Sequence, residues 1–260
     1  MKLKIYQIDA FAEKVFAGNP AAVIPLESWL PDEMMQKIAL ENNLSETVFF
    51  VKTENGFHIR WFTPLAEVNL CGHATLASAH VLFYYLKYAE NEIRFQSRSG
   101  ILKVKKENDL IVLNFPASPL TETEIPENLK NAFNYQPIKG FKGRDDVMLV
   151  FENEEQIVKL NPDFQQILAS KTRGVITTAP SEKFDFVSRF FAPAVGVNED
   201  PVTGSAHTML IPYWSGVLGK IELAAKQVSV RGGILHCKNC GDRVEIGGKA
   251  VTYLTGEIII

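Results

Sequence analysis

The two halves of this chain repeat each other in three places, always in the same order. The matching segments are residues 30–35 and 161–166, residues 60–64 and 189–193, and residues 67–74 and 199–206. Their offsets are 131, 129 and 132 positions, each about half of the 260-residue chain. One such match is expected by chance, but three in order predict two homologous domains of similar topology.

Local patterns inside the repeats predict the same elements in each half. Pro31 and Pro162 suit the first turn of a helix, where no backbone N–H is needed, and the aspartate after each favours the helix dipole. Asn161 is expected to be the N-cap of the second helix. A run typical of a β-strand follows in both halves, at residues 46–50 and 174–178.

The seam between the domains is expected in residues 116–126, a proline-rich and acidic segment without periodicity that is typical of a linker. We therefore predict domains at residues 1–117 and 118–260, with the last residues able to pack on the first domain. Short β-runs precede the linker at residues 92–96, 101–105 and 110–115, and further short runs occur between residues 227 and 260.

One helix in each half has no polar face. Residues 74–86 and 206–218 are almost entirely small or apolar, so each helix is expected to be buried on all sides. Pro212 and Gly216 are expected to kink or shorten the second helix. The predicted fold class is α/β (α+β), with two similar domains that each wrap a curved, mostly antiparallel sheet or barrel around a central helix.

Composition excludes several classes of protein. A hydrophobic fraction of 46% with 22% charged residues is typical of a packed chain and not of a disordered one. The 27 basic and 30 acidic side chains give a net charge of −3 and no basic surface for nucleic acid. Because no signal-peptide pattern or long apolar run occurs, we expect a cytoplasmic protein without membrane contact.

Gly72 and Gly204 stand directly before the two apolar helices. A glycine lets the backbone approach a ligand closely, and a helix N-terminus offers unpaired N–H groups and a positive dipole end to an anion. If both termini face a cleft between the domains, a small carboxylate is held there without lysine or arginine. The alternative is that both glycines only permit tight strand-to-helix turns.

Side chains capable of chemistry gather at the same two turns; they are Cys71, His73, Asp200, Thr203 and Ser205. His73 is expected to be a neutral imidazole, because the helix dipole disfavours its charged form; the alternative is a hydrogen-bonded core histidine. Glu46 opens an apolar β-run and is expected to be partly removed from water, although a solvated strand edge is the simpler alternative. Asp200 and Ser205 have structural alternatives as a turn cap and a hydrogen-bond donor.

The sequence gives no support for a bound metal or a nucleotide cofactor. Cys237 and Cys240 form a single C-x-x-C pair, and His236 adds only one further ligand where zinc needs about four. Motifs of the G-x-G-x-x-G, P-loop and G-x-S-x-G kinds are absent. Three cysteines are also too few for a disulfide scaffold.

Four segments are informative in combination: residues 8–23 with Gly18-Asn19-Pro20-Ala21, Asn43-Leu44-Ser45-Glu46-Thr47, Leu70-Cys71-Gly72-His73-Ala74-Thr75, and Glu199-Asp200-Pro201-Val202-Thr203-Gly204-Ser205-Ala206. Together they resemble the phenazine-biosynthesis isomerase family, the PhzF-like proteins, and the match spans nearly the whole chain. The resemblance implies the diaminopimelate-epimerase fold, a homodimer, a biosynthetic role and no cofactor.

The resemblance also implies roles for individual residues. The residue matching Glu46 shuttles the proton, and those matching His73, Asp200 and Ser205 contact or polarise the substrate. The backbone around Gly72 lines the site, and Gly204, its counterpart in the repeat, is assigned to substrate binding as well.

One departure bears on the type of reaction. The epimerases of this fold use two cysteines, whereas the counterpart of Cys71 here is Thr203, whose hydroxyl cannot replace a thiolate base near neutral pH. We therefore predict a cofactor-independent isomerase in which Glu46 moves a proton within a small carboxylate. The alternatives are an amino-acid epimerase or racemase of the same fold, and a non-catalytic protein that binds a small molecule.

Overall fold

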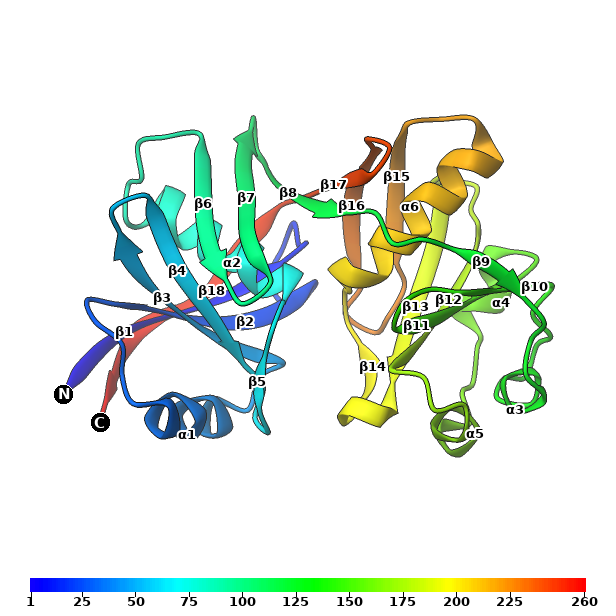
Figure 1. Ribbon diagram of the computed structural model, residues 1–260, viewed down its shortest axis with the longest axis horizontal. Coiled ribbons are helices and arrows are strands. Elements are labelled where there is room, and N and C mark those ends of the chain that lie inside the picture. Colours follow the sequence, from blue (N-terminus) through cyan, green and yellow to red (C-terminus); the bar gives the residue numbers. More distant parts are fainter. The chain divides into compact units, whose positions relative to one another are not determined.

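Strand pairing follows the repeat in the sequence. The computed structural model describes residues 1–260, and its contacts divide it into unit 1, residues 1–114 and 247–260, and unit 2, residues 115–246. Figure 1 shows the elements of each unit coloured along the chain. The end of the chain therefore belongs to unit 1, where its last strand pairs with the first.

Unit 1 contains the helices α1 (Asp32–Asn42) and α2 (Gly72–Tyr84). Its strands are β1 (Lys2–Ala10), β2 (Asn19–Leu26), β3 (Glu46–Thr53), β4 (Gly56–Phe62), β5 (Glu67–Val68), β6 (Glu92–Ser97), β7 (Gly100–Glu107), β8 (Leu110–Pro116), which runs into unit 2, and β18 (Ala250–Ile259).

Unit 2 contains the helices α3 (Glu127–Lys130), α4 (Glu154–Val158), α5 (Phe164–Ala169) and α6 (Gly204–Leu218), and the 3₁₀ turn η1 (Pro193–Val195). Its strands are β9 (Thr121–Thr123), β10 (Lys139–Lys142), β11 (Asp146–Val150), β12 (Gly174–Pro180), β13 (Phe186–Ala192), β14 (Val197–Asp200), β15 (Glu222–Gln227), β16 (Gly233–Asn239) and β17 (Arg243–Gly248), which runs into unit 1.

The two units have the same strand order. In unit 1 it is β18-β1-β2-β3-β4-β6-β7-β8, and only the pairs β2–β3 and β4–β6 are parallel. In unit 2 it is β9-β10-β11-β12-β13-β15-β16, and the equivalent pairs β11–β12 and β13–β15 are parallel. The prediction of two similar, mostly antiparallel domains is therefore confirmed.

The second and third repeats have a direct physical basis in an arginine and a glutamate. Arg60 at the end of β4 donates two hydrogen bonds to Glu67 in β5, both 2.8 Å long. Arg189 in β13 does the same to Glu199 in β14, at 2.7 and 3.0 Å. The charge-assisted pair fixes the turn that leads to the apolar helix in each unit.

The apolar helices are enclosed to different extents. In α2 every residue from His73 to Phe83 is buried, and the helix packs against β1, β2, β3 and β18 (Figure 1). In α6 burial extends only as far as Ser215, and Val217 and Leu218 in the last turn are exposed. The expectation of burial on all sides is confirmed for most of both predicted segments and is wrong at the end of each, since Tyr84, Tyr85 and Leu86 are exposed as well.

Pro212 was expected to kink or shorten α6, and the helix is not shortened. The helix spans 15 residues and α2 spans 13. Proline has no N–H for the carbonyl of Thr208 one turn earlier, but the backbone N–H of Ser118 donates to that carbonyl at 3.0 Å. A neighbouring segment therefore replaces the missing hydrogen bond.

One further local prediction is wrong. Asn161 is not the N-cap of α5; Asp163 is, and its side chain accepts from the backbone N–H groups of Gln165 and Gln166 at 2.9 and 3.2 Å. The predicted linker contains β9, which pairs with β10, so that part of it is ordered by a neighbouring strand.

None of the helices combines the length and the apolar composition that a membrane-spanning helix needs.

Candidate active site

The first group of predicted site residues meets at the start of α2. Glu46 is the first residue of β3, and His73 is the second residue of α2. Oε2 of Glu46 lies 2.9 Å from Nε2 of His73, and the two side chains are only 16% and 6% exposed. Glu46 is therefore a largely buried partner of His73, and the solvated strand-edge alternative is wrong.

The other ring nitrogen of His73 is also contacted. The amide nitrogen Nδ2 of Asn19, the first residue of β2, lies 3.1 Å from Nδ1 of His73. Sγ of Cys71 lies 3.5 Å from the same Nδ1. Because both nitrogens have neighbours, the orientation of the imidazole ring is fixed. Sequence reasoning placed Asn19 in a family motif but did not single it out as a site residue.

The surroundings of His73 oppose the neutral imidazole that the helix dipole predicted. Burial lowers its pKa, but the Glu46 carboxylate and the hydrogen-bonding contact with Cys71 outweigh burial and raise the pKa of His73 well above its ordinary value. The dipole argument missed a carboxylate that a different element brings to 2.9 Å. The Glu46 carboxylate therefore favours the charged form of the ring.

The thiol of Cys71 is held in its protonated form. Burial and the nearby Glu46 carboxylate raise the pKa of Cys71 to about 11, although His73 acts in the opposite direction. One donor atom each of Glu46, Cys71 and His73 lie within 4.8 Å of one another, a spacing that a metal ion can bridge. Binding of a metal there requires the Cys71 thiol to lose its proton.

In unit 2 the predicted residues Asp200 and Thr203 belong to a hydrogen-bonded network. The hydroxyl of Thr203 donates to Oδ2 of Asp200, and Nε2 of Gln227 donates to the Asp200 backbone carbonyl at 2.7 Å and to Oγ1 of Thr203 at 3.1 Å. The backbone N–H of Thr203 donates to Oε1 of Gln227 at 2.9 Å. Gln227, fully buried at the end of β15, was missed by sequence reasoning because no local pattern links it to this turn.

Ser205 has a neighbour that the sequence did not suggest. Nη2 of Arg173 donates to Oγ of Ser205 at 3.2 Å, and the same guanidinium is paired with Asp146. A guanidinium therefore lies beside Ser205, which the expectation of a carboxylate held without arginine did not include. The repeat offers a signal that could have revealed Arg173: it directly precedes residue 174, the position that matches Glu46 when the two predicted strands are aligned.

Gly72 and Gly204 are the first residues of α2 and α6. Neither has a positive φ, so the strand-to-helix turns do not need glycine for backbone conformation. Neither helix has a side-chain hydrogen bond at its N-cap. Backbone conformation therefore does not explain the glycines, and close approach of a ligand stays a prediction.

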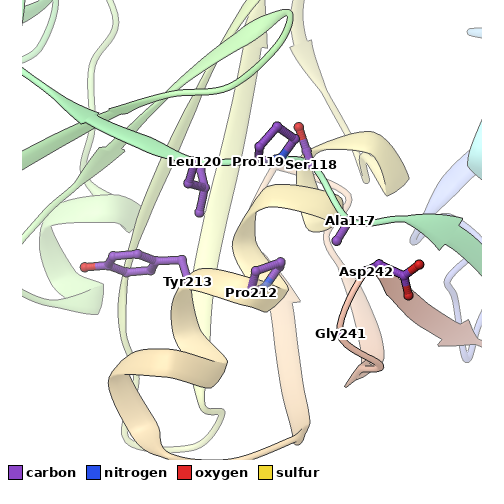
Figure 2. Close-up of a pocket in the computed structure, with 8 residues that line it drawn as sticks. All are labelled: Ala117, Ser118, Pro119, Leu120, Pro212, Tyr213, Gly241 and Asp242. Atoms are coloured by element: carbon purple, nitrogen blue, oxygen red, sulfur yellow. The ribbon is translucent and has the colours of Figure 1, made fainter.

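A shallow cavity of about 370 Å³ lies elsewhere in unit 2. Figure 2 shows its lining, which comes from the chain after β8, from α6 and from the turn before β17: Ala117, Ser118, Pro119, Leu120, Pro212, Tyr213, Gly241 and Asp242. None of the predicted site residues lines it. It follows from the way the Ser118 segment crosses α6 at Pro212.

Comparison with known proteins agrees with the fold and the motifs. A family model described as phenazine biosynthesis-like protein matches residues 8–256. An uncharacterized isomerase of Pseudomonas aeruginosa is 50% identical over 258 residues, covering 99% of both chains. A crystal structure of a PhzF-family phenazine biosynthesis protein from Enterococcus faecalis has a TM-score of 0.98 at 47% identity, covering all of both chains.

A more distant structure shows that the fold is shared with epimerases. A predicted epimerase from Pseudomonas aeruginosa aligns with a TM-score of 0.74 at 19% identity, over 99% of both chains. From the family model and the close relatives together, the chain belongs to the phenazine biosynthesis-like (PhzF) family.

Proposed function

We propose that this protein is an isomerase that moves a proton within a small carboxylate substrate, with Glu46 as the acid/base residue and without a cofactor. The observation that carries the proposal is the buried contact of 2.9 Å between Glu46 and His73. The names of close relatives, uncharacterized isomerases, support the reaction class.

The proposed chemistry needs one carboxylate. Glu46 as carboxylate takes a proton from one carbon of the substrate, and the electron pair of that C–H bond delocalises into an adjacent unsaturated system. The resulting carboxylic acid returns the same proton to another carbon, so that a double bond migrates or an enol becomes a ketone. Acid/base catalysis of this kind contributes about 10²–10⁴-fold to a rate.

His73 and the unit 2 residues have supporting roles in this proposal. The His73 imidazolium stabilises the negative charge that moves from Glu46 onto the substrate. Asp200 and Ser205 contact and polarise the substrate, and the backbone at Gly72 and Gly204 approaches it closely.

The groups at the two helix starts favour one-base over two-base chemistry. Inversion at a stereocentre by two bases requires one group that removes a proton from one face and a second group that returns a proton to the opposite face. The high pKa of Cys71 disfavours a thiolate, and the Thr203 hydroxyl is already donated to Asp200. Proton transfer by a single glutamate is the mechanism that these contacts support best.

The test is proton exchange with solvent. The purified protein is incubated in deuterium oxide with a panel of small unsaturated carboxylates and α-amino acids, and the products are analysed by NMR and chiral chromatography. We expect isomerisation or deuterium incorporation in an unsaturated carboxylate, and at least a 100-fold lower rate in Glu46→Gln. Glu54→Gln, at an exposed glutamate in the turn after β3, is the matched control with wild-type rates.

Other outcomes decide between the alternatives. Retained turnover in Glu46→Gln overturns the role of Glu46. Deuterium incorporation with inversion of an α-amino acid identifies an epimerase instead, and tight binding without exchange on any ligand identifies a binding protein. We also propose a homodimer, which is tested by measuring the mass of the protein by light scattering as it elutes from a size-exclusion column.

A further inference from the structure

The start of β12 in unit 2 occupies the position that Glu46 holds in unit 1. Glu46 begins β3 and lies opposite Ala21 of the parallel strand β2. Gly174 begins β12 and lies opposite Asp146 of the parallel strand β11. Unit 2 therefore carries an aspartate where unit 1 has an alanine, and Arg173 directly precedes the strand.

Asp146 holds the guanidinium of Arg173 in one orientation. Nε of Arg173 donates to Oδ1 of Asp146 at 2.9 Å, and Nη2 donates to Oδ2, so the pair is bidentate. The Asp146 side chain is only 4% exposed, whereas that of Arg173 is 39% exposed. A buried carboxylate thus fixes one edge of the guanidinium, and the opposite edge remains open to solvent.

The open side of the guanidinium is next to Ser205. Nη2 also donates to Oγ of Ser205 at 3.2 Å, and Nη1 makes no hydrogen bond. Because Oγ of Ser205 accepts from Arg173, its own O–H proton remains available to a different acceptor. The guanidinium therefore offers Nη1 as one donor, and through Nη2 it keeps the Ser205 hydroxyl, the second donor, close by.

We propose that Arg173 and Ser205 form a carboxylate-binding site in unit 2, with Asp146 as the residue that positions the guanidinium. The site takes the carboxylate group of the substrate, and this part of the assignment rests on the proposed function. Two fixed donors match the two oxygens of a carboxylate better than a single spherical anion.

The charged residues around the site predict that an anion binds there only if it makes direct hydrogen bonds. Besides Asp146, the carboxylates of Asp145 and Asp200 are close enough to raise the pKa of Arg173. Together with Asp146 these carboxylates outnumber the single guanidinium, so the local charge does not attract anions and binding depends on hydrogen bonds to Nη1 and Ser205. A carboxylate is therefore expected to bind where chloride at the same ionic strength does not.

The experiment is an NMR titration of the full-length ¹⁵N-labelled chain with malonate, a small dicarboxylate, at constant ionic strength set with sodium chloride. Malonamide is the neutral isostere. In the wild-type protein we expect saturable shifts of the Ser205 amide with malonate and none with malonamide. Arg173→Gln is expected to weaken malonate binding about tenfold or more, Arg173→Lys less, and Ser205→Ala by a few-fold.

Two further variants control for structural damage. Arg144→Gln removes a nearby arginine that is 83% exposed, and it is expected to bind malonate like the wild type. Arg173→Gln leaves Asp146 buried without its cation. The double variant Arg173→Gln with Asp146→Asn therefore removes both charges. A cooperative thermal melt of a separate sample shows that the double variant is folded, and its malonate binding is then compared with that of the wild type. It is expected to lose malonate binding to the same extent.

Three results overturn the proposal: no saturable malonate binding by the wild type, equal binding of malonamide, or wild-type malonate affinity in the folded double variant. Glu46→Gln is expected to bind malonate normally, which separates the two proposals. Retained isomerisation in Glu46→Gln removes the glutamate mechanism and leaves this site standing. Lost isomerisation in Glu46→Gln with unaltered malonate binding in Arg173→Gln removes only this site.

Discussion

Each unit places a charged pair at the start of its central helix, and the two pairs differ in composition. In unit 1 the pair is Glu46 and His73, both largely buried. In unit 2 the guanidinium of Arg173 is partly exposed and contacts Ser205, while Asp146 is buried behind it. Burial of a carboxylate beside an imidazole shifts pKa values, which suits proton transfer. A partly exposed guanidinium suits recognition of an anion.

The comparison also shows how a duplicated fold diverges. The strand order and the arginine–glutamate pairs at Arg60 and Arg189 are the same in both units. The residues at the helix starts are not: Cys71 and His73 correspond to Thr203 and Ser205. Duplication therefore leaves two equivalent positions that can take different chemical roles.

The largest expected effect tests the unit 1 pair. His73→Gln removes the cation beside Glu46 and is expected to lower kcat by about 100-fold, since charge stabilisation in a buried site is worth several kcal/mol. The rate is measured by deuterium exchange on the substrate found with the wild type. His58→Gln, at a half-buried histidine of β4, is the control, and turnover of His73→Gln within about threefold of wild type would remove the imidazolium from the mechanism.

The next effect tests whether the Gln227 network stabilises unit 2. Gln227→Met removes the bonds to Asp200 and Thr203 while keeping the volume of the side chain, and it leaves buried polar groups unpaired. We expect the free energy of unfolding in urea to fall by about 2–3 kcal/mol. Gln165→Met, at an exposed position in α5, is expected to change it by less than about 0.5 kcal/mol, and an equal loss in both variants contradicts the role of the network.

A smaller effect comes from buried neutral histidines in both central helices. Burial lowers the pKa of His80 in α2 and of His207 in α6 to about 4. Between the ordinary pKa near 6.5 and about 4, the unfolded chain binds protons that the folded chain does not. The free energy of unfolding is therefore expected to fall as the pH decreases through this window and to level off near pH 4.

His80→Gln separates the unit 1 contribution to this pH dependence. Glutamine does not titrate and can keep the contact that His80 makes with the Thr252 hydroxyl at 3.0 Å. The loss of stability between pH 6.5 and 4 is expected to be about 1–3 kcal/mol smaller in the variant, as measured by urea unfolding at each pH. A pH dependence identical to that of the wild type contradicts a buried neutral His80.

The smallest expected effect distinguishes one-base from two-base chemistry. Cys71→Ser places a favourable N-cap residue at the start of α2 and removes a thiol whose pKa is raised to about 11. Turnover is expected to stay within about threefold of the wild type. A loss as large as that of Glu46→Gln instead makes Cys71 a base and favours the epimerase alternative.

Much of the architecture could be read from local sequence. The repeats predicted duplicated topology, and the helix without a polar face predicted the enclosed α2, because period and composition act over a few residues. Glu46 and His73 were predicted as site residues from a family motif, but not their contact. Distance between residues that are 27 positions apart is a property of the folded chain.

The two local errors have different causes. Asn161 was expected to cap α5, but Asp163, two residues later, is the N-cap, so the helix begins later than expected. Pro212 was expected to kink or shorten α6, but the backbone N–H of Ser118, from a distant segment, donates to the carbonyl of Thr208 and the helix is not shortened. Only the second outcome was decided by a partner outside the local window.

The sequence by itself determined the duplication, the strand and helix types and the identity of the reactive side chains, since these depend on residue order and local preference. Only the tertiary structure decided their chemical state. The raised pKa values of His73 and Cys71 and the fixed guanidinium of Arg173 all follow from charges and burial that other elements bring within a few ångströms. Electrostatic energies depend on distance and on exclusion of water, and neither is encoded in any single segment.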